Sequence, residues 1–401
     1  MSAPESVTDA ATADHPGTGE PSGRRRAVFH PLEVSSVRRL TADSVEVGFT
    51  VPEELADEYD YAAGQYVALR KQIPNADGEL QELRRSYSIC TEPRRGRLEI
   101  AIKRDLGGLF STWANDELSV GDRIDVMSPS GAFISKHRMT GLNDPESIDT
   151  SREHTFVAVA AGSGITPIMA IARTVLAADS AVRFDLIFSN RAAMDVMFLE
   201  ELADLKDRYP DRFGLHHVLT REQRISPLLS GRIDAEKLST LLTRTLRAET
   251  VDEWFLCGPF EMVQLVRDEL EELGVEAEKV RYELFTTGRE NTPGGQVGRP
   301  VEVDDTGDNV QISFRLDGVE GEVASPRAAR ETVLNAALRV RQDVPFACAG
   351  GVCGTCRAKL VEGEVEMSEN FALEPEEIER GYVLTCQSHP TTDAVRVDYD
   401  V

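Results

Sequence analysis

The sequence "CAGGVCGTC", residues 348–356, places three cysteines within nine positions, and only glycine, alanine, valine and threonine lie between them. A fourth cysteine, Cys386, follows in "LTCQSHP". The pattern is therefore C-x4-C-x2-C with one distant cysteine. Two kinds of metal site use four cysteines, and their characteristic spacings differ.

A structural zinc site usually binds through two separated C-x2-C pairs. A plant-type [2Fe–2S] cluster is held by C-x4-C-x2-C and a remote cysteine, and only this spacing fits. The glycines fit as well, because a loop around a cluster must bring backbone N–H groups close to the sulfurs. We therefore predict a [2Fe–2S] cluster, with zinc as the alternative. Its ligands would be Cys348, Cys353, Cys356 and Cys386.

The length of 401 residues predicts two to three domains. The formal net charge of −25 argues against nucleic-acid binding, which needs a basic face. The same charge can steer a basic protein partner, or it can reflect a generally acidic composition. If four of the six cysteines bind iron, only Cys90 and Cys257 remain. A disulfide framework is then excluded, and we expect a cytoplasmic protein.

No stretch of the sequence indicates a membrane protein. Residues 1–26 carry acids and no apolar run, so we predict a disordered tail rather than a signal or transit peptide. Residues 155–172 contain no charged side chain, but "GSG" and Pro167 interrupt them. We therefore predict no membrane segment.

The rest of the chain divides by its patterns. Residues 27–150 contain short β-rich runs separated by Gly, Pro and Asp turns, which predicts a small antiparallel β-barrel. In residues 151–285 apolar strands alternate with amphipathic helices, which predicts an α/β domain with a parallel sheet covered on both faces. Residues 286–309 are rich in Gly, Pro, Asp, Asn and Thr and are predicted to be a linker. Residues 310–401 hold all four proposed ligands and form a separate cluster domain.

Within the α/β region, "VAVAAGSGITPIMAIA" places a glycine turn between a strand and a helix that begins near Pro167. Gly162 and Gly164 would let the backbone approach a pyrophosphate, and the helix N-terminus offers N–H donors. Pro167 takes the place of the third glycine of G-x-G-x-x-G, so the motif alone also fits an ordinary tight turn. Its position at the start of the α/β domain favours a nucleotide site.

The stretch "RRSYSIC", residues 84–90, alternates polar and apolar side chains on a predicted barrel strand. One interpretation is an edge strand whose arginines face solvent. The other is that Arg85 contacts a phosphate while Tyr87 and Ser88 contact a ring system. Spacing alone does not choose between them.

Four segments in order carry a family resemblance: "RSYS" (85–88), "GGLFS" (107–111), "GSGITP" (162–167) and "CGPFEM" (257–262). Together they resemble the ferredoxin–NADP reductase family. With the C-terminal cluster domain attached, residues 27–401 resemble reductase components of bacterial oxygenases, most of all the reductase subunits of phenylacetyl-CoA epoxidases. The resemblance implies a flavin-binding β-barrel, an NAD(P)-binding α/β domain and a C-terminal β-grasp ferredoxin domain of the plant type.

The resemblance also implies roles for individual residues. Arg85 would contact the flavin pyrophosphate, Ser86 would belong to the same motif, Tyr87 would pack on the flavin and Ser88 would lie near its N5. A second flavin loop would hold the diphosphate through Gly107, Gly108 and Ser111. The nucleotide phosphate loop would comprise Gly162, Gly164, Thr166 and Pro167. The nicotinamide pocket would comprise Cys257, Gly258 and Pro259, with Cys257 near the hydride path. By resemblance the flavin is FAD rather than FMN. Without it, Cys257 would be an ordinary small buried residue.

The choice of pyridine nucleotide depends on "FSNRAAMD", just beyond the second strand of the α/β domain. An arginine there can pair with a 2′-phosphate, whereas an acid would hold a free ribose. Ser189 and Arg191 therefore favour NADPH over NADH, although Arg191 also fits a solvated loop charge.

A flavin accepts a hydride and releases single electrons, so it connects NADPH to a one-electron cluster. The three domains together imply an NADPH-dependent reductase that supplies electrons to a terminal oxygenase, by resemblance the one that epoxidises phenylacetyl-CoA. Reductases of steroid or aromatic-ring hydroxylases share this architecture and remain the alternative. A redox sensor or scaffold without fast turnover is an alternative of another class, which rapid NADPH turnover with a one-electron acceptor would exclude.

Overall fold

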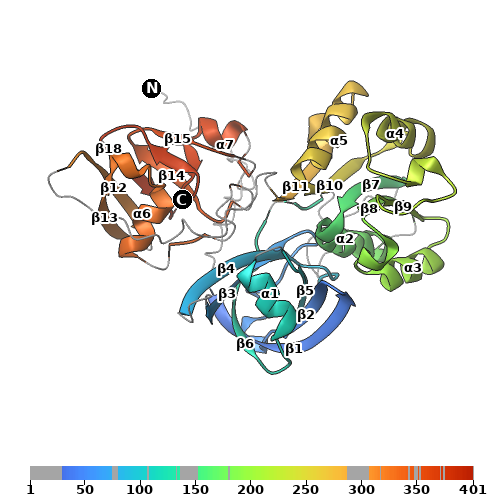
Figure 1. Cartoon of the computed structure of the whole chain (residues 1–401), viewed down its shortest axis with the longest axis horizontal. Coiled ribbons are helices and arrows are strands. Elements are labelled where there is room, and N and C mark those ends of the chain that lie inside the picture. The colour runs from blue at the N-terminus through green and yellow to red at the C-terminus, as the bar shows by residue number, and fades with distance from the viewer. Residues whose placement is uncertain are drawn as a thin grey trace, which may run out of the picture.

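The computed structural model describes residues 29–74, 80–105, 108–131, 133–135, 152–178, 181–286, 307–316, 318–341, 344–346, 351, 354–370, 372–373 and 375–400. Figure 1 shows three bodies in chain order: a curled sheet in blue, an α/β unit in green and yellow, and a C-terminal unit in orange and red. The predicted fold class is confirmed. The tail 1–26 and nearly all of the linker 286–309 lie outside the described residues.

The first body is an antiparallel barrel with the strand order β4-β3-β6-β1-β2-β5. Its side chains alternate, so that one face of each strand fills the interior. A bridge between Ile89 and Ile100 brings the end of β4 to β5 and closes the sheet. The helix α1, Leu109–Asp116, covers one end. The strands are β1 (Phe29–Thr41), β2 (Ser44–Thr50), β3 (Tyr66–Pro74), β4 (Leu80–Ser88), β5 (Arg97–Lys103) and β6 (Arg123–Met127).

The second body is a five-stranded parallel sheet with the order β11-β10-β7-β8-β9. Helices α2 and α3 pack on one face, and α4 and α5 on the other. The strands are β7 (His154–Ala161), β8 (Val182–Asn190), β9 (Phe213–Leu219), β10 (Glu253–Pro259) and β11 (Val280–Thr286). The helices are α2 (Ile165–Ala178), α3 (Leu199–Arg208), α4 (Ala235–Thr240) and α5 (Phe260–Glu272). The strand order reverses between β7 and β10, and ligands of such sheets bind outside the carboxyl ends of the strands at this point.

Two helix boundaries differ slightly from the sequence pattern. The helix expected from about Pro167 begins at Ile165, directly after a 3-10 turn over Gly162–Gly164. The apolar pattern of "DVMFLEELADLKDRY" suggests a helix from Asp195, yet α3 begins at Leu199 because Phe198 adopts a left-handed φ of 59°. The uncharged residues 155–172 form β7, the turn and the first half of α2. Among the described residues, no helix is long and apolar enough to cross a membrane.

The third body is a mixed sheet with the order β13-β12-β18-β14-β16, in which β12 and β18 run parallel. Helix α6, Val333–Val340, packs its apolar side chains on this sheet. A two-stranded sheet of β15 (Val365–Met367) and β17 (Ser388–Pro390) and the short helix α7 (Pro375–Glu379) complete it. The strands of the main sheet are β12 (Asn309–Leu316), β13 (Val319–Pro326), β14 (Arg357–Glu362), β16 (Tyr382–Leu384) and β18 (Ala394–Asp398).

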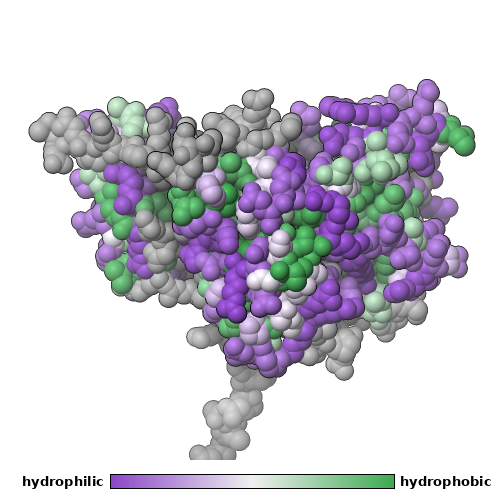
Figure 2. Space-filling model, turned by 60° about the horizontal axis from the view of Figure 1, so that its bottom comes forward, coloured by the Kyte–Doolittle hydropathy of each residue, from purple (hydrophilic) through white to green (hydrophobic). Residues whose placement is uncertain are grey.

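Each body encloses a hydrophobic core, and one core cluster of the second body also includes Ala63, Cys90 and Ala101 of the barrel. The face drawn in Figure 2 is mostly hydrophilic, and hydrophobic residues reach it only in small groups. Apolar burial therefore stabilises each body and also joins the barrel to the parallel-sheet body, as in the contact of Phe133 with Phe255, whose ring centroids lie 5.8 Å apart.

Candidate active site at the carboxyl end of the parallel sheet

The glycine turn after β7 serves two purposes. Gly162 has a left-handed φ of 55°, and a Cβ atom there would meet no atom within 4 Å, so this backbone is open to a ligand. Gly164 is the opposite case, because a Cβ atom would lie 2.1 Å from the carbonyl oxygen of Cys257. The turn is thus packed directly against the end of β10. A helix N-terminus beside such an open turn is a common phosphate site, although the Ile165 N–H already donates within the turn, to the carbonyls of Gly162 and Ser163.

Thr166 and Pro167 shape this turn from inside. The Thr166 hydroxyl donates a hydrogen bond of 3.0 Å to the carbonyl of Ser163. Both residues are buried at the beginning of α2. A direct nucleotide contact by either residue stays a prediction.

The predicted nicotinamide pocket lies at the end of β10. Cys257 is fully buried, and burial, followed by the nearby charge of Glu283, raises the pKa of its thiol well above the ordinary value. The thiol is therefore a neutral S–H group at neutral pH. Gly258 lies so close to β7 that a Cβ atom would be 3.2 Å from the backbone nitrogen of Ala161. Pro259 is exposed and caps α5.

A residue that the sequence patterns did not indicate joins this pocket to the barrel. Glu283 on β11 is the register partner of Cys257 on β10. Its Oε2 atom lies 3.2 Å from the Ser88 hydroxyl, the last residue of β4. Glu283 thus links the two sites: its carboxylate bonds to Ser88, and Cys257 is its neighbour on the adjacent strand. The only hint in the sequence that Glu283 has a special role is that it is the single acid within "VRYELF", a run otherwise suited to a strand.

Several side chains of the flavin motif on β4 contact other residues of the protein. Tyr87 packs its ring 5.9 Å from that of Phe110, and burial raises the pKa of Tyr87. Arg85 is half-buried and donates a 2.7 Å hydrogen bond to the carbonyl of Arg84. Arg84 is only 2% exposed, so the interpretation in which the arginines of this strand face solvent is wrong for Arg84.

The Ser86 hydroxyl is buried and has no hydrogen-bond partner among the described residues. Buried hydroxyls are almost always bonded, so this orphaned group fits a contact with a bound molecule. By strand alternation it shares the face of Ser88, which is expected near the flavin N5. The residues of this motif therefore fit a flavin.

The second flavin loop leads into α1. Gly108 is the N-cap of α1 and provides no side-chain cap, which leaves the N–H groups of the first turn open to an anion. Ser111 is 3% exposed, and its hydroxyl accepts from the Asp105 backbone N–H at 3.0 Å and donates to the Gly108 carbonyl at 3.3 Å. Ser111 thus holds the shape of the loop. Gly107 lies outside the described residues.

The residues expected to choose the nucleotide lie at the end of β8. Ser189 is the register partner of Ala161, one residue before the glycine turn. The guanidinium of Arg191 lies 3.3 Å from Asp43 and 3.3 Å from Asp195, so it is engaged in ion pairs rather than simply solvated. These two acids would compete with a 2′-phosphate for Arg191. The preference for NADPH stays a prediction.

Two of the four predicted cluster ligands lie in the described part of the C-terminal body. Cys356 immediately precedes β14 and Cys386 follows β16, and the pairing of Arg357 with Leu384 brings the two segments together. The backbone N–H and hydroxyl of Thr385 both donate to the Cys356 carbonyl, at 3.2 and 2.9 Å. Both cysteines are buried. Cys348 and Cys353 lie outside the described residues.

The two glycines of the cluster loop that the structure describes have the expected backbone, and Gly350 lies outside the described residues. Gly351 and Gly354 adopt left-handed φ values of 77° and 68°. Such a backbone strains any residue with a side chain. The loop geometry therefore fits a backbone that folds closely around a cluster.

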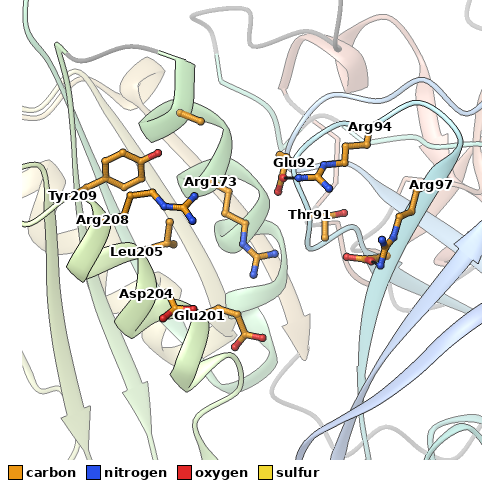
Figure 3. A pocket seen from close by; sticks show the side chains of 12 residues that line it. Thr91, Glu92, Arg94, Arg97, Arg173, Glu201, Asp204, Leu205, Arg208 and Tyr209 are labelled. Atoms are coloured by element: carbon orange, nitrogen blue, oxygen red, sulfur yellow. Dashed lines mark hydrogen bonds and ion pairs between the residues drawn. The ribbon is translucent and has the colours of Figure 1, made fainter.

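A separate hollow of about 340 Å³ lies between the barrel and helices α2 and α3 (Figure 3). Its walls carry charges of both signs, and several pair with one another: Arg94 with Glu92, and Arg97 with Glu99. Arg173 from α2 reaches the barrel and donates to the Cys90 carbonyl at 3.1 Å. None of the predicted site residues lines this hollow.

Comparison with known proteins agrees with this division. A family model of oxidoreductase FAD-binding domains matches residues 31–134, one of oxidoreductase NAD-binding domains matches 158–268, and one of 2Fe-2S iron-sulfur cluster binding domains matches 314–391. The crystal structure of phthalate dioxygenase reductase aligns with a TM-score of 0.57 at 22% identity and covers 92% of this chain and 98% of that one. At this identity the likeness concerns the fold.

Two relatives match over almost their whole length. The chain is 40% identical over 372 residues to a subunit of the 1,2-phenylacetyl-CoA epoxidase of Escherichia coli strain K12, covering 93% of this chain and 98% of that protein. It is 31% identical over 380 residues to the ferredoxin reductase component of 3-ketosteroid-9-alpha-monooxygenase of Rhodococcus rhodochrous, covering 94% and 98%. The chain therefore belongs to the ferredoxin–NADP reductase-like oxygenase reductases, and it is an oxidoreductase with FAD-binding, NAD-binding and [2Fe–2S] domains.

Proposed function

We propose that this protein takes electrons from NADPH and delivers them, through FAD and the [2Fe–2S] cluster, to a terminal oxygenase that epoxidises phenylacetyl-CoA. The observation that carries the electron route is the hydrogen bond between Ser88 and Glu283, with Cys257 as the register partner of Glu283. It joins the flavin motif to β11, the strand beside the nicotinamide pocket and next to the switch point of the parallel sheet. The choice of oxygenase is supported by the 40% identity to the phenylacetyl-CoA epoxidase component.

When FAD and the cluster are bound, the two electrons of a hydride enter together and leave one at a time, and the proton of the hydride passes to solvent. The chain's own residues provide placement. Gly162 and the start of α2 offer N–H donors to the dinucleotide phosphates, and Gly164 fixes the turn against β10. Ser88 and Glu283 hold a hydrogen-bonded pair where the two ring systems are expected to meet.

Cys257 and Glu283 also control protons at this point. The Cys257 thiol is neutral, so it adds no negative charge beside an arriving hydride. Glu283 accepts a hydrogen bond from Ser88 and can receive or supply a proton at the same place. Ser88 is 3% exposed, so little water reaches its hydroxyl to compete for this hydrogen bond. No separate nucleophile or general-base triad is needed.

The proposal extends to the compartment. Cys90 and Cys257 are buried free thiols, which suits the reducing cytoplasm. A second candidate partner is the oxygenase of a steroid hydroxylase, favoured by the 31% identity to the 3-ketosteroid monooxygenase component.

The test is an anaerobic titration of the purified holoprotein with NADPH, followed by visible absorption and EPR. We expect the flavin absorption to bleach and a reduced [2Fe–2S] signal to grow. Iron-replete protein that bleaches without a cluster signal would contradict the electron route. The partner is then tested by coupled turnover: the phenylacetyl-CoA oxygenase subunits should form epoxide at the expense of NADPH, and faster turnover with a 3-ketosteroid oxygenase would favour the second candidate.

A further inference from the structure

The strand that carries the flavin motif also contacts the cluster domain. Arg84, adjacent to Arg85 on β4, is 2% exposed, and its Nη1 atom donates a 3.1 Å hydrogen bond to the carbonyl of Val344. The guanidinium lies over the ring of Phe346, 5.0 Å from its centroid. Val344 and Phe346 belong to the C-terminal domain and directly precede the first predicted cluster ligand, Cys348.

A second contact involves the other side of the cluster loop. The hydroxyl groups of Tyr66 on β3 and of Thr355 lie 2.8 Å apart. Thr355 lies between the predicted ligands Cys353 and Cys356. Tyr66 is also the cross-strand partner of Ser88. One hairpin of the barrel, β3–β4, therefore touches both the segment before the cluster loop and a residue near the end of that loop.

The outward surface of the barrel near Tyr66 is buried rather than exposed to solvent. Tyr66, Ala68 and Met127 are 4%, 0% and 1% exposed, and together with Phe29 they form a cluster separate from the barrel interior. The outward face of a small barrel normally meets water. In Figure 1 the β3–β4 edge is the part of the barrel nearest the C-terminal domain. Burial of an outward apolar cluster and of an arginine marks this edge as an interface.

We propose that the contacts of Arg84 with Val344 and Phe346, and of Tyr66 with Thr355, form a docking joint that holds the cluster loop beside the flavin for the flavin-to-cluster step. The inference rests on the proposed function and assigns positioning residues to it. Successive side chains of a strand point to opposite faces, so Arg84 and Arg85 point apart, and Arg84 is the one that contacts the cluster domain. The two arginines of "RRSYS" thus have separate duties.

Electron transfer slows steeply as donor and acceptor move apart. A joint that sets the distance between flavin and cluster should therefore affect the flavin-to-cluster step and not the hydride step. The hydride step is expected at the Ser88 end of β4, where Glu283 lies, and the contacts of the joint are made by other residues. A guanidinium suits the joint because it donates a charge-assisted hydrogen bond and stacks on an aromatic ring at once. Truncating Arg84 removes both interactions and leaves the Val344 carbonyl without this donor.

The chain supplies a matched control. Arg70 is the cross-strand partner of Arg84 and stacks on the same Phe29 ring, at 4.5 Å against 5.5 Å for Arg84. Its ion pair, with Asp125 at 2.9 Å, stays within the barrel. Arg84→Leu and Arg70→Leu therefore perturb the same hairpin, but only the first removes a contact with the cluster domain. Tyr66→Phe removes one hydroxyl group and tests the second contact with little risk to the fold.

The experiment compares the holoproteins in two ways. Hydrogen–deuterium exchange of peptides covering residues 339–346 and 354–362 reports the docked state without turnover. Anaerobic stopped-flow mixing with NADPH separates flavin bleaching from cluster reduction. We expect Arg84→Leu to raise exchange in both peptides and to slow cluster reduction about tenfold, with flavin bleaching within about twofold of wild type. Tyr66→Phe should show a smaller effect of the same kind, and Arg70→Leu neither.

Three results would contradict the proposed docking joint. Unchanged exchange and unchanged cluster reduction in Arg84→Leu would mean that these contacts hold nothing in place. Raised exchange with unchanged cluster reduction would mean that docking here does not position the cluster for electron transfer. Equal slowing of flavin bleaching in Arg84→Leu and Arg70→Leu would assign the effect to the barrel. If the wild-type cluster is not reduced at all, the proposed function fails, and the exchange comparison still decides whether the joint exists.

Discussion

Ser88 Oγ lies 3.2 Å from Glu283 Oε2, so the last residue of the flavin-motif strand is bonded to the strand next to the nicotinamide pocket. These residues are 195 positions apart in the chain. A hydrogen bond to a carboxylate is among the stronger ones in proteins and is directional. The contact therefore fixes the distance between the two halves of the reaction site.

Glu283→Gln keeps the size of the side chain but removes its charge and its capacity to take a proton. We expect NADPH-dependent flavin bleaching to slow by about 10- to 100-fold, because a positioned proton-transfer group contributes about this much or more. FAD should remain bound, since Glu283 lies outside the flavin motif. Stopped-flow absorption measures both properties.

Glu276→Gln is the control for this prediction. Glu276 is exposed and lies just before β11, so its substitution changes the net charge of the same region without touching Ser88. Bleaching at the wild-type rate in Glu283→Gln would show that the carboxylate is only a structural link.

Arg191→Ala tests nucleotide choice. We expect kcat/KM for NADPH to fall about tenfold and that for NADH less than twofold, because only NADPH has a 2′-phosphate for the guanidinium. Asp195→Asn should act in the opposite direction and raise the NADPH preference, since it removes one of the two acids that pair with Arg191. Steady-state kinetics with both nucleotides measures the ratio. Equal losses with NADPH and NADH in Arg191→Ala would end the 2′-phosphate role.

Cys257→Ser tests the neutral thiol. A hydroxyl is smaller and more strongly hydrogen-bonding than a thiol, and at this fully buried position we expect flavin bleaching to slow about tenfold with FAD still bound. Cys90→Ser is the control, because Cys90 is also fully buried with a raised thiol pKa but lies in the barrel. Slowing of the same size in both variants would assign the effect to lost packing.

The sequence was sufficient for the features that depend on local pattern. Alternating runs such as "SVEVGFTV" predict β2, and the rhythm of strand and helix predicts the parallel sheet, because burial on one face leaves a period in the chain. Cysteine spacing predicts the cluster for a similar reason, since three of the four proposed ligands are close in sequence. Gly162 and Gly164 indicate the phosphate turn, but the sequence does not show that Gly162 faces open space while Gly164 packs against β10.

Long-range contacts were beyond the reach of these patterns. Glu283 is the single acid in β11, and no neighbouring residue in the sequence indicates that its carboxylate will bond to Ser88. Arg84 and Arg85 are identical neighbours, and only the placement of the C-terminal domain separates them. Arg191 could be assigned to a phosphate from its position, but its pairing with Asp43 comes from a loop of another domain.

The charged hollow between the barrel and α2–α3 makes stability depend on pH through Glu99. Burial, and then the charge of Glu46, raise the pKa of Glu99, while Arg97 opposes them. A carboxyl whose pKa is raised in the folded state binds its proton more tightly there than in the unfolded chain. Its contribution to stability is therefore fully present below the ordinary pKa of 4.5 and is lost as pH rises through the raised value.

Glu99→Gln removes this cost of ionisation and should raise Tm at pH 7–8 by about 1–3 °C, a shift that should vanish near pH 4. Thermal unfolding followed by circular dichroism at the two pH values measures it. Glu92→Gln is the control in the same hollow, because the Glu92 side chain is 33% exposed against 13% for Glu99, and it should change Tm little at either pH. A lower Tm of Glu99→Gln at pH 8 would mean that the ion pair with Arg97 outweighs burial, and that the hollow is held together by its charges.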